Sequence, residues 1–112
     1  MMNKKSEIRI FVELDDKKMP LNIDWEATDA GFDGKKPAKT LMLSLWDENE
    51  NVTLGIDLWT KEMTVEEMSL HYHQILYKMA ETFEKATLNS EAANLLKDFS
   101  NTFAKKLKLK RN

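Results

Sequence analysis

The sequence predicts an α+β fold, with a four-stranded antiparallel sheet of two hairpins over residues 6–59 followed by two C-terminal helices packed on one face of that sheet. Three observations predict it: apolar residues alternate along the N-terminal half, a helix-capping motif begins at Thr64, and apolar residues then recur every three or four positions. With 112 residues, 42% of them hydrophobic and 32% charged, the chain fits one globular domain over 1–112 with a single modest core.

The first hairpin is predicted from two alternating segments joined by a polar turn. In 6–14 the aliphatic residues fall on one face, namely Ile8, Ile10, Val12 and Leu14. A turn at 15–18 follows, and Pro20 stands at the expected start of the next strand, where its missing N–H is tolerated. Residues 21–28 alternate again, which predicts the second strand.

The second hairpin is predicted after a loop at 29–37, which holds two of the three glycines and Pro37. Segment 38–47 places Leu41, Leu43 and Leu45 on one face, and 52–59 places Val52, Leu54, Ile56 and Leu58 inward. The polar turn at 47–51 joins them. The loop at 29–37 marks no domain boundary, because neither half is large enough to hold a core alone.

The helices are predicted at 64–88 and 90–108. Thr64-Val65-Glu66-Glu67 fits a capping box, and Met63 and Met68 occupy the two hydrophobic-staple positions around it. An apolar stripe then runs along the first helix, comprising Val65, Met68, Tyr72, Ile75, Leu76, Met79, Ala80, Phe83 and Ala86. Asn89 or Ser90 is expected to cap the second helix, whose stripe is Leu95, Leu96, Phe99, Phe103 and Leu107.

Composition and charge exclude several function classes. The chain has no cysteine, so disulfides and thiol chemistry are excluded. It shows no signal peptide and no apolar run long enough for a membrane span, and the expected location is the cytoplasm. Residues 105–112 carry a charge of +5, so the net charge of −2 leaves −7 on the remainder, which does not suit a nucleic-acid binder. The basic end, Lys105 to Arg111, is interpreted as cations favourable at a helix C-terminus, with acidic lipid or RNA as the other interpretation.

The sequence predicts no metal or cofactor site. His71 and His73 are two residues apart, so on a helix they point in opposite directions and cannot share a metal ion. His71 has Glu67 four residues before it, which is usual for a solvated pair. The segment starting at Asp47 begins like a calcium-binding loop but has Val52 at the glycine position and Leu58 at the glutamate position.

No catalytic residue is predicted either, because no nucleophile motif, phosphate-binding loop or dinucleotide fingerprint occurs. Asp24, Glu26 and Asp57 could line the outer face of the sheet as paired carboxylates. Polar residues covering a solvent-facing sheet explain them more simply, so we expect a protein that is not an enzyme.

The candidate interface is aromatic. Phe11, Met42, Trp46 and Trp59 all fall on the face opposite the aliphatic core, where they would form an apolar cluster that a small monomer does not normally leave in water. Tryptophan is a typical interface anchor. The alternative is that a bulge or a strand end turns Trp46 and Trp59 back toward the core.

Several segments together closely resemble the GldC family of gliding motility proteins of the Bacteroidetes. The resemblance rests on Leu45-Trp46-Asp47, on the run Ile56-Asp57-Leu58-Trp59-Thr60-Lys61-Glu62-Met63, on His73-Gln74 and on 79–87, with similar segments at 5–8, 12–15 and 23–28. It covers nearly the whole chain except 29–36 and the lysine-rich end. The resemblance implies a small cytoplasmic protein associated with surface gliding, a process linked to type IX secretion, with no catalytic activity and no site residues to transfer.

The predicted function is therefore that of a non-enzymatic accessory or adaptor protein of the gliding machinery, acting through protein–protein contacts. Its partners are expected to be other proteins of that machinery, with a homodimer through the outer sheet face as one form of contact. The alternative is a small-ligand or lipid-binding module with a pocket between sheet and helices, since seven methionines and large aromatics make an adaptable cavity conceivable.

Overall fold

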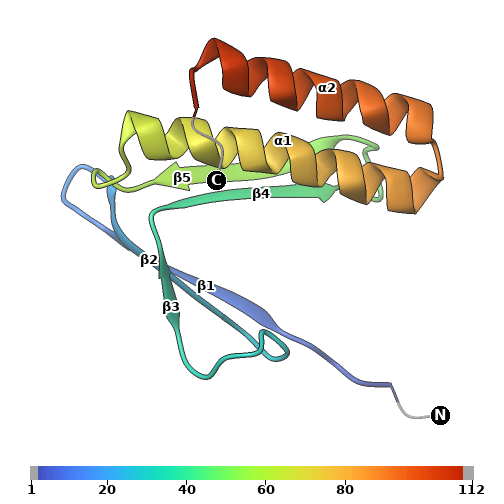
Figure 1. The fold of residues 1–112 in the computed structure, drawn as a ribbon. Helices are drawn as coiled ribbons and strands as arrows, with labels where there is room; N and C mark the ends of the chain where they lie inside the picture. The colour runs from blue at the N-terminus through green and yellow to red at the C-terminus, as the bar shows by residue number, and fades with distance from the viewer. Residues whose placement is uncertain (1–2, 110–112) are drawn as a thin grey trace. The chain divides into compact units, whose positions relative to one another are not determined.

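The structure is a computed structural model that describes residues 3–109. It confirms the α+β class, with five antiparallel strands in two sheets followed by two helices (Figure 1). The chain divides into two compact units, Met1–Met63 and Thr64–Asn112. The first unit holds all the strands and the second holds both helices. That the chain forms one domain, with the helices on one face of the sheet, stays a prediction.

The first sheet has the order β1-β2-β3, formed by Ile8–Leu14, Pro20–Ala27 and Lys36–Ala38. Alternate residues fall on alternate faces, and directly paired residues share a face. Val12 lies opposite Ile23 and Ile10 opposite Trp25, so the predicted aliphatic face of β1 continues across β2. Ile23 is only 2% exposed and is the most buried large side chain of this unit.

An aspartate closes the turn between β1 and β2. The Asp15 carboxylate accepts hydrogen bonds from the backbone N–H groups of Lys17 and Met19, at 2.8 and 2.9 Å. Lys18 has a positive φ of 65°, which reverses the chain. The register shifts between Glu13 and Leu14, which leaves one extra residue on β2 and forms a β-bulge.

The second sheet is a two-stranded hairpin of β4, Thr40–Trp46, and β5, Thr53–Trp59. Its turn is also organised by an aspartate, because the Asp47 carboxylate accepts from the N–H groups of Asn49 and Glu50. Asn51 takes the left-handed conformation with φ 55°, which asparagine tolerates better than most residues. The segment that begins like a calcium-binding loop is therefore a hairpin turn.

Both predicted hairpins occur, but their strands belong to two sheets rather than to one continuous four-stranded sheet. The predicted loop at 29–37 also differs at its end, since Lys36 and Pro37 belong to the short strand β3. Pro37 lacks an N–H, so it fits at the edge of a sheet and nowhere inside one. The chain passes from the first sheet to the second at Lys39, whose carbonyl accepts a hydrogen bond from the Thr60 N–H at 2.8 Å.

The second unit is a pair of helices, α1 over Val65–Thr87 and α2 over Ser90–Lys106. The capping box is confirmed: the Glu67 N–H donates to the Thr64 hydroxyl and the Thr64 N–H donates to the Glu67 carboxylate, both at 3.0 Å. Leu88 ends α1 in the left-handed conformation with φ 61°. Asn89 caps α2 by accepting from the Ala92 N–H at 3.0 Å.

The two helices meet along small residues. Ala80, Ala93 and Ser100 have no exposed surface, and Ala104 is nearly buried. Ala80 belongs to the predicted stripe of α1, whereas most large members of both stripes lie about a quarter of a turn away from these small residues, at 3.6 residues per turn. Large members of both stripes are therefore exposed, including Met79 and Phe83 on α1 and Leu95 and Phe99 on α2.

Candidate functional site

The candidate interface lies mainly on one face of the β4–β5 hairpin. Thr40 pairs with Trp59, Met42 with Asp57 and Trp46 with Thr53, so Met42, Trp46 and Trp59 share a face. The opposite face carries the leucines and Ile56. Trp46 is 67% exposed and Trp59 51% exposed. Leu45, Leu54 and Ile56 on the opposite face, which the sequence predicted to point inward, are exposed to a similar extent. The role of Trp46 and Trp59 as an interface stays a prediction.

The three side chains do not form one continuous cluster. Met42 and Trp59 are diagonal neighbours across the ladder, within reach of each other. Trp46 stands at the other end of the hairpin, six positions along β4 from the residue opposite Trp59, or about 20 Å at the usual rise of a strand. Between them lie Ser44 and Gly55, the smallest residues of this face. The face thus carries an aromatic side chain at each end and small side chains at its centre.

Phe11 belongs to the other sheet. It lies on β1 opposite Asp24 of β2, on the face that also carries Arg9 and Glu26. The Lys35 ammonium lies 3.9 Å from the centre of its ring, which is a cation–π contact. Phe11 is partly exposed, to the same extent as Val12 on the aliphatic face. The structure therefore divides the four predicted interface residues between two sheets.

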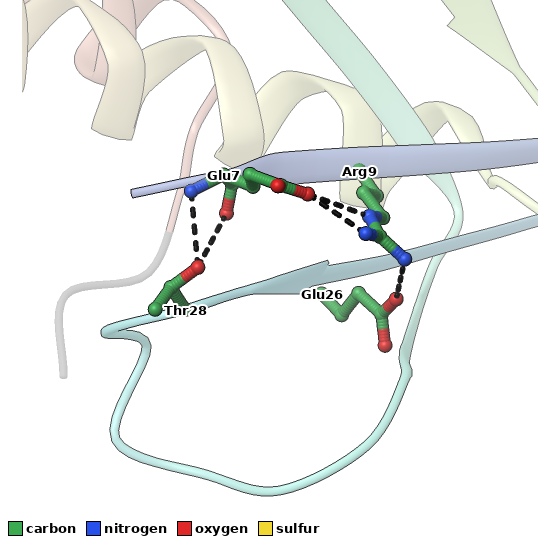
Figure 2. Close-up of polar contacts among 4 residues, drawn as sticks. All are labelled: Glu7, Arg9, Glu26 and Thr28. Carbon is green, nitrogen blue, oxygen red and sulfur yellow. Dashed lines mark hydrogen bonds and ion pairs between the residues drawn. The ribbon is translucent and has the colours of Figure 1, made fainter. Parts of the chain in front are cut away.

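A hollow opens beside the start of β1 and the end of β2. Figure 2 shows Arg9 between two carboxylates, with its guanidinium 2.8 Å from Glu7 and 3.8 Å from Glu26. Figure 2 also shows the Thr28 hydroxyl, which accepts from the Glu7 N–H at 3.0 Å and donates to the Glu7 carbonyl at 3.5 Å. The Thr28 N–H donates to the same carbonyl at 3.0 Å, so Thr28 joins the ends of the two strands. The lining is completed by loop residues, namely Phe32, Asp33 and Gly34.

Arg9 is the one cation that lines this hollow, beside the carboxylates of Glu7, Glu26 and Asp33. The hydrogen bond to Glu7, and the negative charges of Glu7 and Glu26, raise the pKa of Arg9 above its usual value. Arg9 and Glu7 are both well exposed, and such surface pairs contribute little to stability. The arrangement orders the end of the β1–β2 ladder.

A second hollow lies at the passage between the two sheets, beside Ile23, Pro37 and Thr60. Thr60 is 4% exposed, and its buried hydroxyl has no hydrogen-bond partner among the described residues. An unpartnered buried hydroxyl costs roughly 1–3 kcal/mol. No pattern in the sequence singled out Thr60 beyond its place in the Ile56–Met63 segment.

The carboxylates considered as a catalytic set are not brought together. Asp24 and Glu26 lie on β2, whereas Asp57 lies on β5 in the other sheet. Within residues 3–109, no group of three or more histidine, aspartate or glutamate side chains is arranged to hold a metal ion.

The histidines have different surroundings. His71 is half-buried, and its Nε2 atom has no hydrogen-bond partner within the described part of the chain. His73 joins the two helices, because its Nδ1 lies 2.8 Å from the Ser100 hydroxyl and 3.0 Å from the Ser100 carbonyl. The Ser100 hydroxyl also lies 3.1 Å from the His73 carbonyl, to which it can donate. Ser100 is completely buried, so this serine–histidine pair is a helix–helix contact and not a nucleophile.

This contact between the helices was not predicted from the sequence. The spacing of Ala93, Ser100 and Ala104 could have indicated it, because this spacing places three small residues on one face of α2. A second polar contact joins the same helices, where Lys97 lies 3.4 Å from Glu84. Hydrogen bonding from Ser90, and then the charge of Lys97, lowers the pKa of Glu84.

The basic end is described only in part. Lys105 and Lys106 lie in the last turn of α2, where positive charge is favourable, while Lys110 and Arg111 lie outside the described residues. No helix within residues 3–109 is long and apolar enough to cross a membrane.

Comparison with known proteins gives a family. No curated protein and no solved structure matches the chain. A protein-family model described as gliding motility-associated protein GldC-like matches residues 20–109, which spans β2 to the end of α2. The matched segment includes the β4–β5 face and both helices. The chain therefore belongs to the GldC-like family of gliding motility-associated proteins.

Proposed function

We propose that this protein is a non-enzymatic accessory or adaptor component of the bacterial gliding machinery, acting in the cytoplasm through contacts with other proteins of that machinery. Family membership supports the association with gliding. The observation that carries the mode of action is the exposure of Trp46 and Trp59 on one face of the β4–β5 hairpin. Large exposed aromatic residues are characteristic of protein interaction sites.

The β4–β5 face suits a partner that reaches both ends of the hairpin. Trp59 and Met42 offer one apolar contact, and Trp46 offers a second about 20 Å away. The centre of the face carries Ser44, Gly55 and Asp57, which offer a hydroxyl, free space and a carboxylate. A partner that contacts only one end gains part of the binding free energy, so each tryptophan should contribute separately.

Alanine variants test this proposal. The tagged chain is produced in a gliding bacterium from which its own copy has been removed, and gliding and co-isolated proteins are compared for Trp46→Ala and Trp59→Ala. We expect each variant to fold, as judged by circular dichroism, and to lose both gliding and partner recovery. Removing a tryptophan that anchors an interface costs about 2 kcal/mol or more, so binding should fall roughly thirtyfold.

Val65→Ala is the matched control, because Val65 is 83% exposed at the start of α1 and lies outside the β4–β5 face. It should leave gliding and partner recovery unchanged. The proposal fails if the folded tryptophan variants retain every partner and the same oligomeric state as the natural chain.

A further inference from the structure

The two edges of the three-stranded sheet differ in how open they are to pairing. β3 is three residues long, contains Pro37 and carries Lys36, and short strands with proline and lysine resist edge-to-edge pairing. β1 is seven residues long and contains neither proline nor lysine. Among the described strands it pairs only with β2, so its other edge is unpaired. An edge of this length without such protection is suited to receive another strand.

The direction of the backbone groups at this edge follows from one hydrogen bond. The Thr28 N–H donates to the Glu7 carbonyl directly opposite it, at 3.0 Å. Backbone groups alternate along an antiparallel strand, so those of Arg9, Phe11 and Glu13 also face β2. The N–H and C=O groups of the even-numbered residues face the free edge, from Ile8 to Leu14.

The sequence of β1 is complementary to itself in one antiparallel register. Centring two copies on Phe11 places Phe11 opposite itself and Arg9 opposite Glu13 of the other copy, twice by symmetry. All seven residues of β1 then have a partner, and the outward-facing backbone groups of the two strands oppose each other. Arg9 and Glu13 fall at the positions where antiparallel side chains lie closest.

The neighbouring registers are worse. Centring on Ile10 places Glu7 opposite Glu13, which is repulsive. Centring on Val12 places Phe11 opposite Glu13 and requires Asp15, whose carboxylate already accepts the hydrogen bonds of the turn. In the register centred on Phe11, Glu7 and Asp15 are the only like-charged pair, and both lie beyond the ends of the strand.

We infer that β1 pairs antiparallel with β1 of a second copy, centred on Phe11, to form a continuous six-stranded sheet in a homodimer. The pairing places Ile8, which is 75% exposed, opposite Leu14, which is 49% exposed, and so covers part of the apolar surface of both copies. Charge complementarity and a seven-residue edge without proline or lysine carry this inference. It does not depend on the proposed adaptor function, which uses the face of the other sheet.

Disulfide trapping tests the register. The chain has no cysteine, so each introduced thiol is unique. Under mild oxidation Phe11→Cys should form a covalent dimer, because opposed residues at such positions have Cβ atoms about 4.5–5.5 Å apart, near the disulfide range. Lys36→Cys, on the protected edge of the same sheet, is the control and should stay monomeric on a non-reducing gel.

A second pair of cysteine variants tests the register of the two β1 strands. Arg9→Cys alone should not crosslink, because two copies of position 9 are separated by four residues along the strands, about 13 Å. An equimolar mixture of Arg9→Cys and Glu13→Cys should crosslink efficiently. Equal crosslinking of Phe11→Cys and Lys36→Cys would overturn the inference, and so would a dimer in which Phe11→Cys fails to crosslink.

Charge reversal gives a readout that does not depend on a thiol. Arg9→Glu and Glu13→Arg should each weaken dimerisation about tenfold in sedimentation equilibrium, because each places like charges opposite one another. The double variant Arg9→Glu/Glu13→Arg should recover most of that loss. Arg9 also contacts Glu7 and Glu26 within its own chain, and the double variant does not restore those contacts, so recovery must come from the second copy. A natural chain that is monomeric at every concentration tested contradicts the inference.

Discussion

The strand unit and the helix unit achieve their internal packing in opposite ways. The strand unit has one large, nearly inaccessible apolar side chain, Ile23. The helix unit is closed by residues without bulk, namely Ala80, Ala93, Ser100 and Ala104. A sheet buries large side chains that stand perpendicular to its surface. Two helices, in contrast, approach closely only where their facing side chains are small. Enlarging a residue should therefore damage the helix unit, and truncating one should damage the strand unit.

Ile23→Ala is expected to have the largest effect. The substitution removes the most buried large side chain of the strand unit, and truncation of a buried isoleucine to alanine costs roughly 2–5 kcal/mol. Urea unfolding followed by tryptophan fluorescence measures the loss. The control is Ile8→Ala, whose side chain is 75% exposed and should cost much less. Equal losses for the two variants would show that Ile23 is not the centre of this unit.

Ser100→Leu tests the opposite requirement in the helix unit. Ser100 has no exposed surface, so the added carbon atoms must push α1 and α2 apart, and such overpacking costs roughly 1–3 kcal/mol. The variant also removes the hydroxyl that contacts His73. Thermal unfolding followed by circular dichroism at 222 nm measures the change in stability. Ser100→Ala, which keeps the helices close, should lose less; if it loses as much as the leucine variant, the hydroxyl matters more than the close approach.

Thr64→Ala tests the capping box at the start of the helix unit. The substitution removes the side chain that accepts from the Glu67 N–H, and loss of an N-cap typically costs about 0.5–2 kcal/mol. Chemical denaturation provides the measurement. Thr64→Ser keeps the hydroxyl and should retain most of the stability. A serine variant as weak as the alanine variant would point to packing of the threonine methyl group instead of the cap.

Asp15→Asn tests the aspartate that closes the β1–β2 turn of the strand unit, and it should have the smallest effect. Backbone hydrogen bonds, that of Met19 foremost, lower the pKa of Asp15 below its usual value. A lowered pKa in the folded state contributes stability above the unfolded-state pKa, and that stability is lost as the pH falls through the folded-state value. The variant should thus be less stable than the natural chain at neutral pH, with the difference shrinking in acid. Thermal unfolding between neutral pH and pH 3 checks this, and a difference independent of pH would contradict it.

The local elements were predictable because their signals are short in sequence. The capping box at Thr64, the cap at Asn89 and the strands of both hairpins lie where the residues predict them. The exposed Trp46 and Trp59 also lie on the predicted face of their strands. Each of these features depends on residues within a few positions of one another.

The division into two sheets was not predictable in this way. Alternation assigns a face to each residue but does not say which strands share a ladder, so Phe11 and Trp59 could be placed on one surface only by assuming one sheet. β3 was not predicted, because three residues containing a proline carry almost no periodic signal: Lys36 and Pro37 fall in the predicted loop and Ala38 in the predicted strand 38–47.

The sequence by itself determined the strands of both hairpins, the two helices, their caps and which residues of a strand share a face, because backbone hydrogen bonding and side-chain alternation are local properties. Only the tertiary structure decided that the strands separate into β1-β2-β3 and β4-β5, and that α1 and α2 meet through alanines, Ser100 and His73. Those outcomes depend on how closely distant segments can approach. Close approach favours small residues over the apolar stripes that dominate the pattern of the sequence.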